Sequence, residues 1–289
     1  MKVLIIGGGG MLGHKLVQIL NDKFEVYTTI KGKFSDYKNF LPFPKKHTFE
    51  NVNVEDIESV KRIIEQIKPD VVFNAVGLIK QLPSSKNVIK TLSINSIFPH
   101  QLNELAEEFQ FRLLTVSTDC VFNGEKGNYK ETDISDAFDL YGKSKNLGEV
   151  TGDNCLTLRT SIIGRELKTS HSLVEWFLSN RGKKVKGFVN AIYTGFPTIV
   201  LSHIVADLIK NYPKLNGLYH ISSEPINKFK LLQLINIAYE ANIEIELSED
   251  FVIDRSLDST KFRGATGFKP LEWKQMIELM ANDRTFYQH

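Results

Sequence analysis

The chain has 289 residues, of which 42% are hydrophobic and 24% charged, and its 36 basic and 34 acidic residues leave a formal net charge of +2. This length is sufficient for a large buried core, and the interspersed charges give no indication of a nucleic-acid or membrane partner. Two cysteines are too few for a disulfide framework, and no apolar run approaches the roughly 18 residues of a membrane helix. We therefore expect a soluble protein in the reducing cytoplasm.

In the first half of the chain, short apolar runs alternate with longer segments of helical period, as in repeated β-α-β units. The expected strands are Val3–Ile6, Glu25–Ile30, Thr48–Asn51, Val71–Ala75, Arg112–Ser117 and Cys155–Arg159. The expected helices are Met11–Leu20, Val54–Ile67, Ile89–Glu108 and Leu140–Val150, with a loop at Lys31–Lys46. The strands lack polar alternation, which is typical of a sheet covered on both faces. The pattern predicts an α/β fold with a Rossmann-like, doubly wound parallel sheet.

Beyond Gly164 the regular alternation fades and turn signals become frequent. The remaining expected elements are helices at Ser172–Leu178, Val200–Asn211 and Lys228–Ala241 and a strand at Leu218–Ser222. We predict a nucleotide-binding domain over residues 1–164, to which elements near 196–222 return. Residues 165–289 are expected to form mainly a smaller substrate-binding lobe over the carboxyl edge of the sheet, where ligands bind in such folds.

A glycine-rich turn follows the first expected strand and begins the first expected helix. Its glycines are spaced as Gly7-x-x-Gly10-x-x-Gly13, and Met11 and Leu12 lie between the last two. In this context a glycine permits the sharp turn, another permits backbone amides to approach a pyrophosphate, and a third permits close helix packing. The turn therefore predicts a dinucleotide site.

The end of the second expected strand bears on the choice of dinucleotide. An acidic residue there would bind the ribose 2′-hydroxyl of NAD, but the chain has Thr28, Thr29 and Ile30, followed by Lys31 and Lys33. Basic residues without a carboxylate favour the 2′-phosphate of NADP. Lysines on an exposed loop are commonly only solvated, so NAD remains open.

A tyrosine and a lysine on the fourth expected helix lie four positions apart. Tyr141 and Lys145 would share a helix face, so that an ammonium could lie near a phenol and lower its pKa. Such a pair can deliver and withdraw a proton. The spacing by itself also fits a packed aromatic and a surface lysine.

Several motifs occur in the order found in one enzyme group. They are Gly7–Gly13, Pro69–Ala75, Ser117–Phe122, Tyr141–Lys145, Leu158–Ser161, Gly195–Thr198, Gly217–Ile221 and Pro270–Trp273. With these motifs the chain resembles the extended short-chain dehydrogenase/reductases, and within them the dTDP-4-dehydrorhamnose reductase group. The resemblance spans nearly the whole chain and is much more specific than any single motif.

The resemblance implies reduction of a nucleotide-linked 4-keto-6-deoxy sugar, in deoxysugar and cell-surface polysaccharide biosynthesis. It makes Tyr141 the proton donor to the sugar ketone, while hydride arrives from the nicotinamide. Lys145 would bind the nicotinamide ribose and hold the pKa of the tyrosine down. Thr118 would hydrogen-bond the ketone oxygen as negative charge develops there.

The resemblance also implies further contacts. Cofactor contacts would come from Asn53 and Val54 near the adenine and from Ala75, Val76 and Gly77 after the fourth strand. Substrate contacts would come from Asp119 and Ile162, with Lys80, Asn95 and Arg159 as weaker candidates. The histidines lack the spacing of metal ligands, so no metal site is expected.

Three departures from the family pattern bear on the reaction and the substrate. The sugar-nucleotide 4,6-dehydratases have a glutamate where this chain has Cys120, so reduction is favoured over dehydration. Ile162 and the pair Ile192-Tyr193 replace a tryptophan and an Asp-Gln pair of the rhamnose enzyme. A UDP-linked 2-acetamido-4-keto-6-deoxy sugar is therefore as credible a substrate as dTDP-4-dehydrorhamnose.

Two other functions remain open. The chain could be an NADP-binding regulatory subunit, since the β subunit of methionine adenosyltransferase is a relative of this reductase group. It could also be a sugar-nucleotide epimerase, which would demand tightly retained NAD. A homodimer is open as well.

Overall fold

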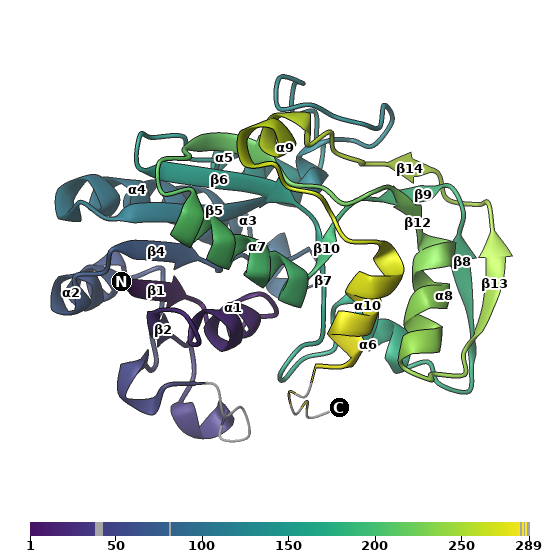
Figure 1. The fold of residues 1–289 in the computed structure, drawn as a ribbon, viewed down its shortest axis with the longest axis horizontal. Helices are drawn as coiled ribbons and strands as arrows, with labels where there is room; N and C mark the ends of the chain where they lie inside the picture. Colours follow the sequence, from purple (N-terminus) through teal and green to yellow (C-terminus); the bar gives the residue numbers. More distant parts are fainter. Residues whose placement is uncertain (38–42, 81, 284, 286, 288–289) are drawn as a thin grey trace.

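A seven-stranded parallel sheet forms the centre of the computed structural model, which describes residues 1–289 except 38–42, 81, 284, 286 and 288–289 (Figure 1). Its strand order is β11-β6-β5-β4-β1-β2-β3, and every neighbouring pair is parallel. The strands are β1 (Lys2–Ile6), β2 (Glu25–Thr29), β3 (Thr48–Phe49), β4 (Val71–Asn74), β5 (Arg112–Thr118), β6 (Cys155–Thr160) and β11 (Gly217–His220). The predicted doubly wound parallel sheet is confirmed.

Helices cover both faces of this sheet. They are α1 (Gly13–Leu20), α2 (Ile57–Ile67), α3 (Val88–Leu92), α4 (Phe98–Phe109), α5 (Leu140–Leu147) and α7 (Thr198–Asn211). Alternate residues of β1 enter opposite cores, since Val3 and Ile5 pack with the α1 and α7 side, whereas Leu4 and Ile6 pack with α2 and α4. Burial on both faces explains why the strands read as continuous apolar runs.

The expected helix Ile89–Glu108 is interrupted. A π-helical segment, η4 (Ser93–Ile97), separates α3 from α4. Within it the Asn95 side chain accepts from Leu78 N–H at 2.7 Å and donates to the Leu78 carbonyl and the Ser144 hydroxyl, both at 3.1 Å. These buried bonds stabilise the extra residue of the wider turn. Asn95 therefore links the loop after β4 to α5.

Some expected boundaries shift. Helix α1 begins at Gly13 instead of Met11, and α5 ends at Leu147 instead of Val150. Gly148, the residue after α5, packs directly against the Asn95 carbonyl. The expected loop Lys31–Lys46 contains the short 3-10 helices η1 (Phe34–Tyr37) and η2 (Lys45–His47), while residues 38–42 lie outside the described chain.

The C-terminal residues form small sheets at one end of the main sheet (Figure 1). Their elements are α6 (Leu173–Leu178), β8 (Lys184–Phe188), β9 (Ala191–Tyr193), β12 (Ile226–Asn227), α8 (Lys228–Ala238), β13 (Glu244–Ser248), β14 (Ile253–Asp254), α9 (Thr260–Thr266) and α10 (Trp273–Ala281). Strand β9 lies between β12 and β14, and β8 pairs with β13. The connecting strands β7 (Ile162–Ile163) and β10 (Phe196–Pro197) pair with each other. Helix α7 packs against α1, and β11 pairs with β6 at the edge of the main sheet. Among the described helices, none has the length and apolar character that crossing a membrane requires.

Candidate active site

The glycine turn lies where the strand order of the sheet reverses. β1 pairs with β2 on one side and β4 on the other, and ligands of doubly wound folds bind at such a point. Gly7 has a φ of +90°, which an L side chain rarely adopts. A side chain at Gly13 would collide with the carbonyl oxygen of Gly7. Both glycines are thus required by the turn itself.

Gly10 differs from these two glycines. A Cβ at Gly10 would meet only the Gly7 oxygen, at 3.4 Å, so internal packing does not require glycine there. Helix α1 begins just beyond, and its N-cap residue Leu12 offers no side-chain cap to the first backbone N–H groups. The open backbone at Gly10 and Met11 therefore fits a dinucleotide pyrophosphate at a helix N-terminus.

Alanine substitutions separate these roles. We expect Gly13→Ala to lower the thermal unfolding midpoint markedly, because its Cβ meets backbone that cannot move aside. Gly10→Ala should leave the midpoint nearly unchanged and weaken NADPH binding by about tenfold or more, a loss of roughly 1.4 kcal/mol. Calorimetric melting and fluorescence titration with NADPH measure the two effects. Unchanged NADPH affinity in Gly10→Ala would contradict the assignment of the pyrophosphate to this turn.

The structure brings other predicted cofactor residues to the same edge. Thr29 Oγ1 accepts a hydrogen bond from Gly7 N–H at 3.1 Å, so Thr29 supports the turn. Val76, between Ala75 and Gly77, packs against Gly7. Lys31 and Asn53 are exposed, and Val54 is partly buried next to Asn53. The backbone bond from Val52 N–H to Ile30 O, 3.0 Å long, places these residues side by side on the rim of the site.

Thr118 and Tyr141 lie together at the carboxyl end of β5. The Thr118 hydroxyl donates to Asp119 at 3.1 Å and accepts from Cys120 N–H at 3.1 Å. Asp139 caps α5 by accepting from Gly142 N–H at 2.7 Å, and Gly142 packs closely on the Cys120 carbonyl. This packing directs Tyr141 toward Thr118. Burial raises the pKa of Tyr141, and the hydrogen bond with Thr118 opposes this rise.

Lys145 is one turn further along α5. Its Nζ donates to the carbonyl oxygen of Val116 at 2.7 Å. Burial lowers the pKa of Lys145 to about 8, and the nearby Glu149 opposes that shift. The expectation that Lys145 holds the pKa of Tyr141 down does not hold in this structure, because burial dominates the phenol and the ammonium is bound to Val116. A raised pKa keeps the phenol protonated, as a proton donor requires.

The other expected substrate contact, Ile162, and the weaker candidates Lys80 and Arg159 lie outside this group. Ile162 lies on β7 and packs against the large core. Lys80 forms a surface ion pair with Asp139 at 2.7 Å. Arg159, considered above as a substrate contact, is buried and pairs with Glu149 at 2.6 Å, so that interpretation is wrong. The structure thus assigns Arg159 to the support of the site.

Sequence reasoning had named Tyr193 but missed Lys228 and Arg255, which lie near it on the C-terminal lobe. The buried Tyr193 hydroxyl has no hydrogen-bond partner in the described part of the chain, and Lys228 Nζ lies 4.3 Å from the centroid of the Tyr193 ring. Arg255 donates to the Phe122 carbonyl at 2.8 Å, and its Nη1 lies 3.5 Å from Cys120 Sγ.

These side chains surround Asp119. Burial raises the pKa of Asp119, and Arg255 and Lys228 oppose the rise. Burial lowers the pKa of Lys228 to about 8, although the charge of Asp119 acts to raise it. An orphaned hydroxyl, a carboxylate and two cations next to Thr118 form a polar site suited to a hydroxyl-rich, anionic ligand. The sequence gives only a weak signal for this group. Lys228 and Arg255 each follow a strand of two residues, β12 and β14.

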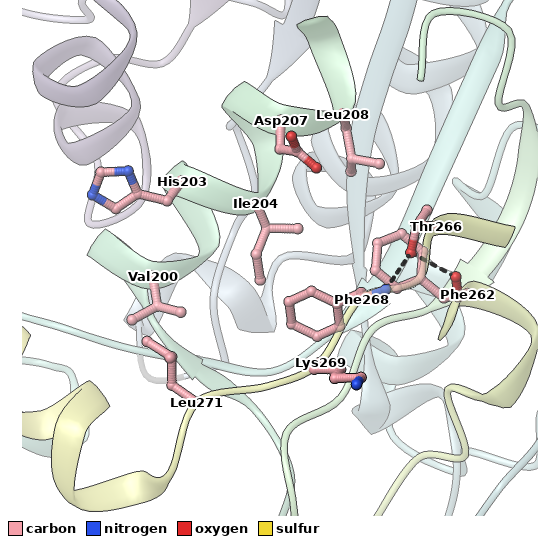
Figure 2. A pocket seen from close by; sticks show the side chains of 10 residues that line it. All are labelled: Val200, His203, Ile204, Asp207, Leu208, Phe262, Thr266, Phe268, Lys269 and Leu271. Atoms are coloured by element: carbon pink, nitrogen blue, oxygen red, sulfur yellow. Dashed lines mark hydrogen bonds between the residues drawn. The ribbon is translucent and has the colours of Figure 1, made fainter. Parts of the chain in front are cut away.

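A cavity lies apart from these candidate site residues. Figure 2 shows this pocket, about 250 Å³ in volume, between α7, α9 and the segment that joins α9 to α10, where Phe268 faces Ile204. None of the predicted site residues lines it. Within the described ranges, no three His, Cys, Asp or Glu side chains gather as metal ligands would.

Comparisons with known proteins find relatives over most of the chain. The chain is 27% identical to dTDP-4-dehydrorhamnose reductase of Aggregatibacter actinomycetemcomitans, over 96% of this chain and 97% of that protein. It is 25% identical to methionine adenosyltransferase 2 subunit beta of Xenopus tropicalis, over 80% of this chain and 70% of that protein.

Solved structures share the fold. The dTDP-4-dehydrorhamnose reductase of Bacillus anthracis in complex with NADP superposes with a TM-score of 0.79 at 20% identity, covering 96% of this chain and 98% of that one. The UDP-glucose 4-epimerase of Thermus thermophilus in complex with NAD gives a TM-score of 0.78 at 19% identity, covering 98% of both chains. The model of the RmlD substrate binding domain matches residues 1–286, and the chain therefore belongs to the RmlD substrate binding domain family.

Proposed function

We propose that this protein is an NADPH-dependent reductase of a nucleotide-linked 4-keto-6-deoxy sugar, acting in deoxysugar and cell-surface polysaccharide biosynthesis. The observation that supports this most is the convergence of Thr118, Tyr141 and Lys145 at the carboxyl edge of the sheet. The glycine turn lies at the same edge, two strands away from β5. Membership of the RmlD substrate binding domain family supports the same class of substrate.

Bound NADPH supplies the hydride in this proposal. The Tyr141 phenol gives its proton to the oxygen of the ketone, and its raised pKa keeps that proton in place until the oxygen becomes basic. The Thr118 hydroxyl, which donates to Asp119 in this structure, would turn its proton to the same ketone oxygen and stabilise the developing charge there. The Lys145 ammonium, with a pKa of about 8, is mostly charged at neutral pH and binds ribose hydroxyls.

The rest of the site would hold the sugar nucleotide. Asp119 and the Tyr193 hydroxyl are suited to sugar hydroxyl or amide groups, and Lys228 and Arg255 to negative charge on the substrate. Burial raises the pKa of Cys120 to about 12, so this side chain is a neutral thiol and cannot do the work of a glutamate. The side chain at this position therefore favours simple reduction over dehydration.

The basic rim beyond β2 supports NADP over NAD. Lys31 is exposed and follows Thr29 without an acidic neighbour in the position that would bind a ribose 2′-hydroxyl. We expect Lys31→Glu to weaken NADPH binding by about tenfold, because a carboxylate there repels the 2′-phosphate, while NADH binding stays within about twofold. The exposed Lys210, at the end of α7, provides the matched control Lys210→Glu. Equal losses for both cofactors would argue against this role of Lys31.

Two competing functions make different predictions for one experiment. Purified protein is offered dTDP-, UDP- and GDP-linked 4-keto-6-deoxy sugars with NADPH or NADH, and absorbance at the nicotinamide band is followed. Net oxidation with at least one substrate supports the reductase. NADPH binding without turnover on any of them would favour a regulatory subunit, to which the likeness to methionine adenosyltransferase 2 subunit beta lends weight. Tightly retained NAD with sugar interconversion and no net oxidation would favour an epimerase.

A further inference from the structure

A buried network behind the candidate active site faces Lys145. Glu149 follows Lys145 by four residues, just beyond the end of α5, and its side chain is 8% exposed. Its carboxylate accepts from the Ser117 hydroxyl at 2.6 Å and from Arg159 Nε and Nη2 at 2.7 and 2.6 Å. A two-point guanidinium contact fixes the orientation of a carboxylate as well as its position.

Sheet register explains how this network forms. In the parallel pairing of β5 with β6, Ser117 lies opposite Arg159, and in that of β6 with β11, Arg159 lies opposite His220. Arg159 Nη1 donates to His220 Nε2 at 3.3 Å, so the proton of this neutral imidazole resides on Nδ1 and is donated to the Tyr129 carbonyl at 3.0 Å. Burial lowers the pKa of His220 to about 4, which keeps the ring neutral. The guanidinium also packs over Phe122, 5.3 Å from the ring centroid.

The side chains of Lys145 and Glu149 both form hydrogen bonds with strand β5. Lys145 Nζ donates to the carbonyl of Val116, and Glu149 accepts from the hydroxyl of the next residue, Ser117. The ammonium and the carboxylate are therefore bound to consecutive residues of β5. Glu149 raises the pKa of Lys145, against the larger effect of burial.

The other titratable groups of α5 and of the elements around it come from several segments. They are Asp119 and Cys120 from η5 (Asp119–Val121), Tyr141 and Lys143 from α5, Asp139 at its N-cap, Lys90 from α3, Arg112 from β5, Arg159 from β6 and His220 from β11. Asp119 lies among Arg255 and Lys228, and Asp139 pairs with Lys80. Segment η4 contributes the neutral side chains Asn95 and Ser96, which bond to Ser144. Glu149 is thus the acidic side chain placed to act on Lys145.

We propose that Glu149, oriented by Arg159 and Ser117, is a positioning residue that keeps the Lys145 ammonium charged in the candidate active site. The catalytic role of this effect rests on the proposed function. The effect of Glu149 on the charge of Lys145 involves only residues of this chain. A hydrophobic pair of similar volume could stabilise the fold as well as the buried Arg159–Glu149 ion pair does. An effect of Glu149 on Lys145 gives this ion pair a role beyond stability.

The test is a pH titration of Lys145 in the free protein. Lysine labelled with ¹³C at Cε is followed by NMR, and the Lys145 signal is identified by its loss in Lys145→Met. We expect a midpoint near 8 in the parent protein, and one lower by about one pH unit or more in Glu149→Gln, which keeps an oxygen acceptor but removes the charge. Ser117→Ala is the matched control, because it removes one hydrogen bond and leaves the carboxylate with Arg159, and its midpoint should move much less.

Glu149→Gln leaves Arg159 buried without its carboxylate partner, and this variant could fail to fold. A second variant keeps the test decisive in that case. Glu149→Gln combined with Arg159→Met removes both charges, and it should show the same lowered midpoint. An unchanged midpoint in either folded variant overturns the inference. The titration requires no substrate or cofactor, so a failure of the proposed reductase activity would leave its outcome intact. In the active enzyme, the loss of rate on raising the pH should begin at a lower pH in Glu149→Gln than in the parent protein.

Discussion

Tyr141→Phe should lower kcat for ketone reduction by about 10²- to 10⁴-fold, the usual contribution of a general acid. The substitution removes only the phenol oxygen, so the ring continues to fill its place between η5 and α5. NADPH affinity should remain within about threefold, because Lys145 and the glycine turn are untouched. Steady-state kinetics and a fluorescence titration with NADPH measure the two quantities.

The control for this variant is Tyr219→Phe. Tyr219 lies on β11, where its ring packs edge-on against Phe262 and under Lys261, and it belongs to no predicted site. Its loss should leave kcat unchanged. Activity of Tyr141→Phe within a fewfold of the parent protein would remove Tyr141 from the mechanism.

The second large effect is expected on stability. Lys15 on α1 forms a buried ion pair with Asp283, and both side chains are only 3% exposed. Lys15 also donates to Gln18 and Thr285, each at 2.8 Å. Lys15→Met would leave Asp283 buried without its cation, and breaking a buried pair in this way costs about 3–5 kcal/mol of the free energy of unfolding. Guanidinium unfolding followed by circular dichroism measures the loss.

Two further variants test the origin of this loss. Lys15→Met combined with Asp283→Asn removes both charges and should recover a large part of the stability. Lys61→Met removes a surface pair with Glu108, whose side chain is 51% exposed, and should change stability much less. A loss in Lys15→Met no larger than that in Lys61→Met would mean that the pair contributes little.

The position of this ion pair also has a functional consequence. Helix α1 carries the glycine turn at its N-terminus, and Asp283 ties that helix to the C-terminal end of the chain. The same end contributes Tyr287, whose hydroxyl donates to Asp283 at 2.8 Å and whose ring lies 4.5 Å from Arg165. Loosening the C-terminal segment should therefore weaken dinucleotide binding together with stability.

The fold and the residues proposed to bind the cofactor follow from local sequence. A run of four or five apolar residues buried on both faces reveals a parallel strand, and the glycine turn and the Tyr141–Lys145 pair each fall within a few consecutive residues. Strand β1 and helix α1 are accordingly predicted to within two residues of their ends. The register that sets Ser117 opposite Arg159 is a property of the assembled sheet, and so the role of Arg159 could not be predicted from its neighbours in sequence.

The substrate half of the site depends on tertiary structure. Tyr193 ends β9, and Lys228 and Arg255 follow β12 and β14, the two-residue strands that pair with β9. Strands this short have no periodicity from which to predict them. The π-helical segment at Asn95 was missed for a related reason, because its one extra residue is stabilised by distant partners, Leu78 and Ser144, instead of by helix propensity.

The central claim is that hydride passes from NADPH to C4 of a sugar ketone on this protein. NADPH deuterated at the transferable position of nicotinamide C4 is supplied with each nucleotide-linked 4-keto-6-deoxy sugar, and the product is analysed by mass spectrometry and NMR. Our account predicts one deuterium per product molecule, located at C4 of the sugar, with one NADPH consumed for each. Consumption of NADPH without deuterium at C4, or no reduced product from any of these substrates, would contradict it.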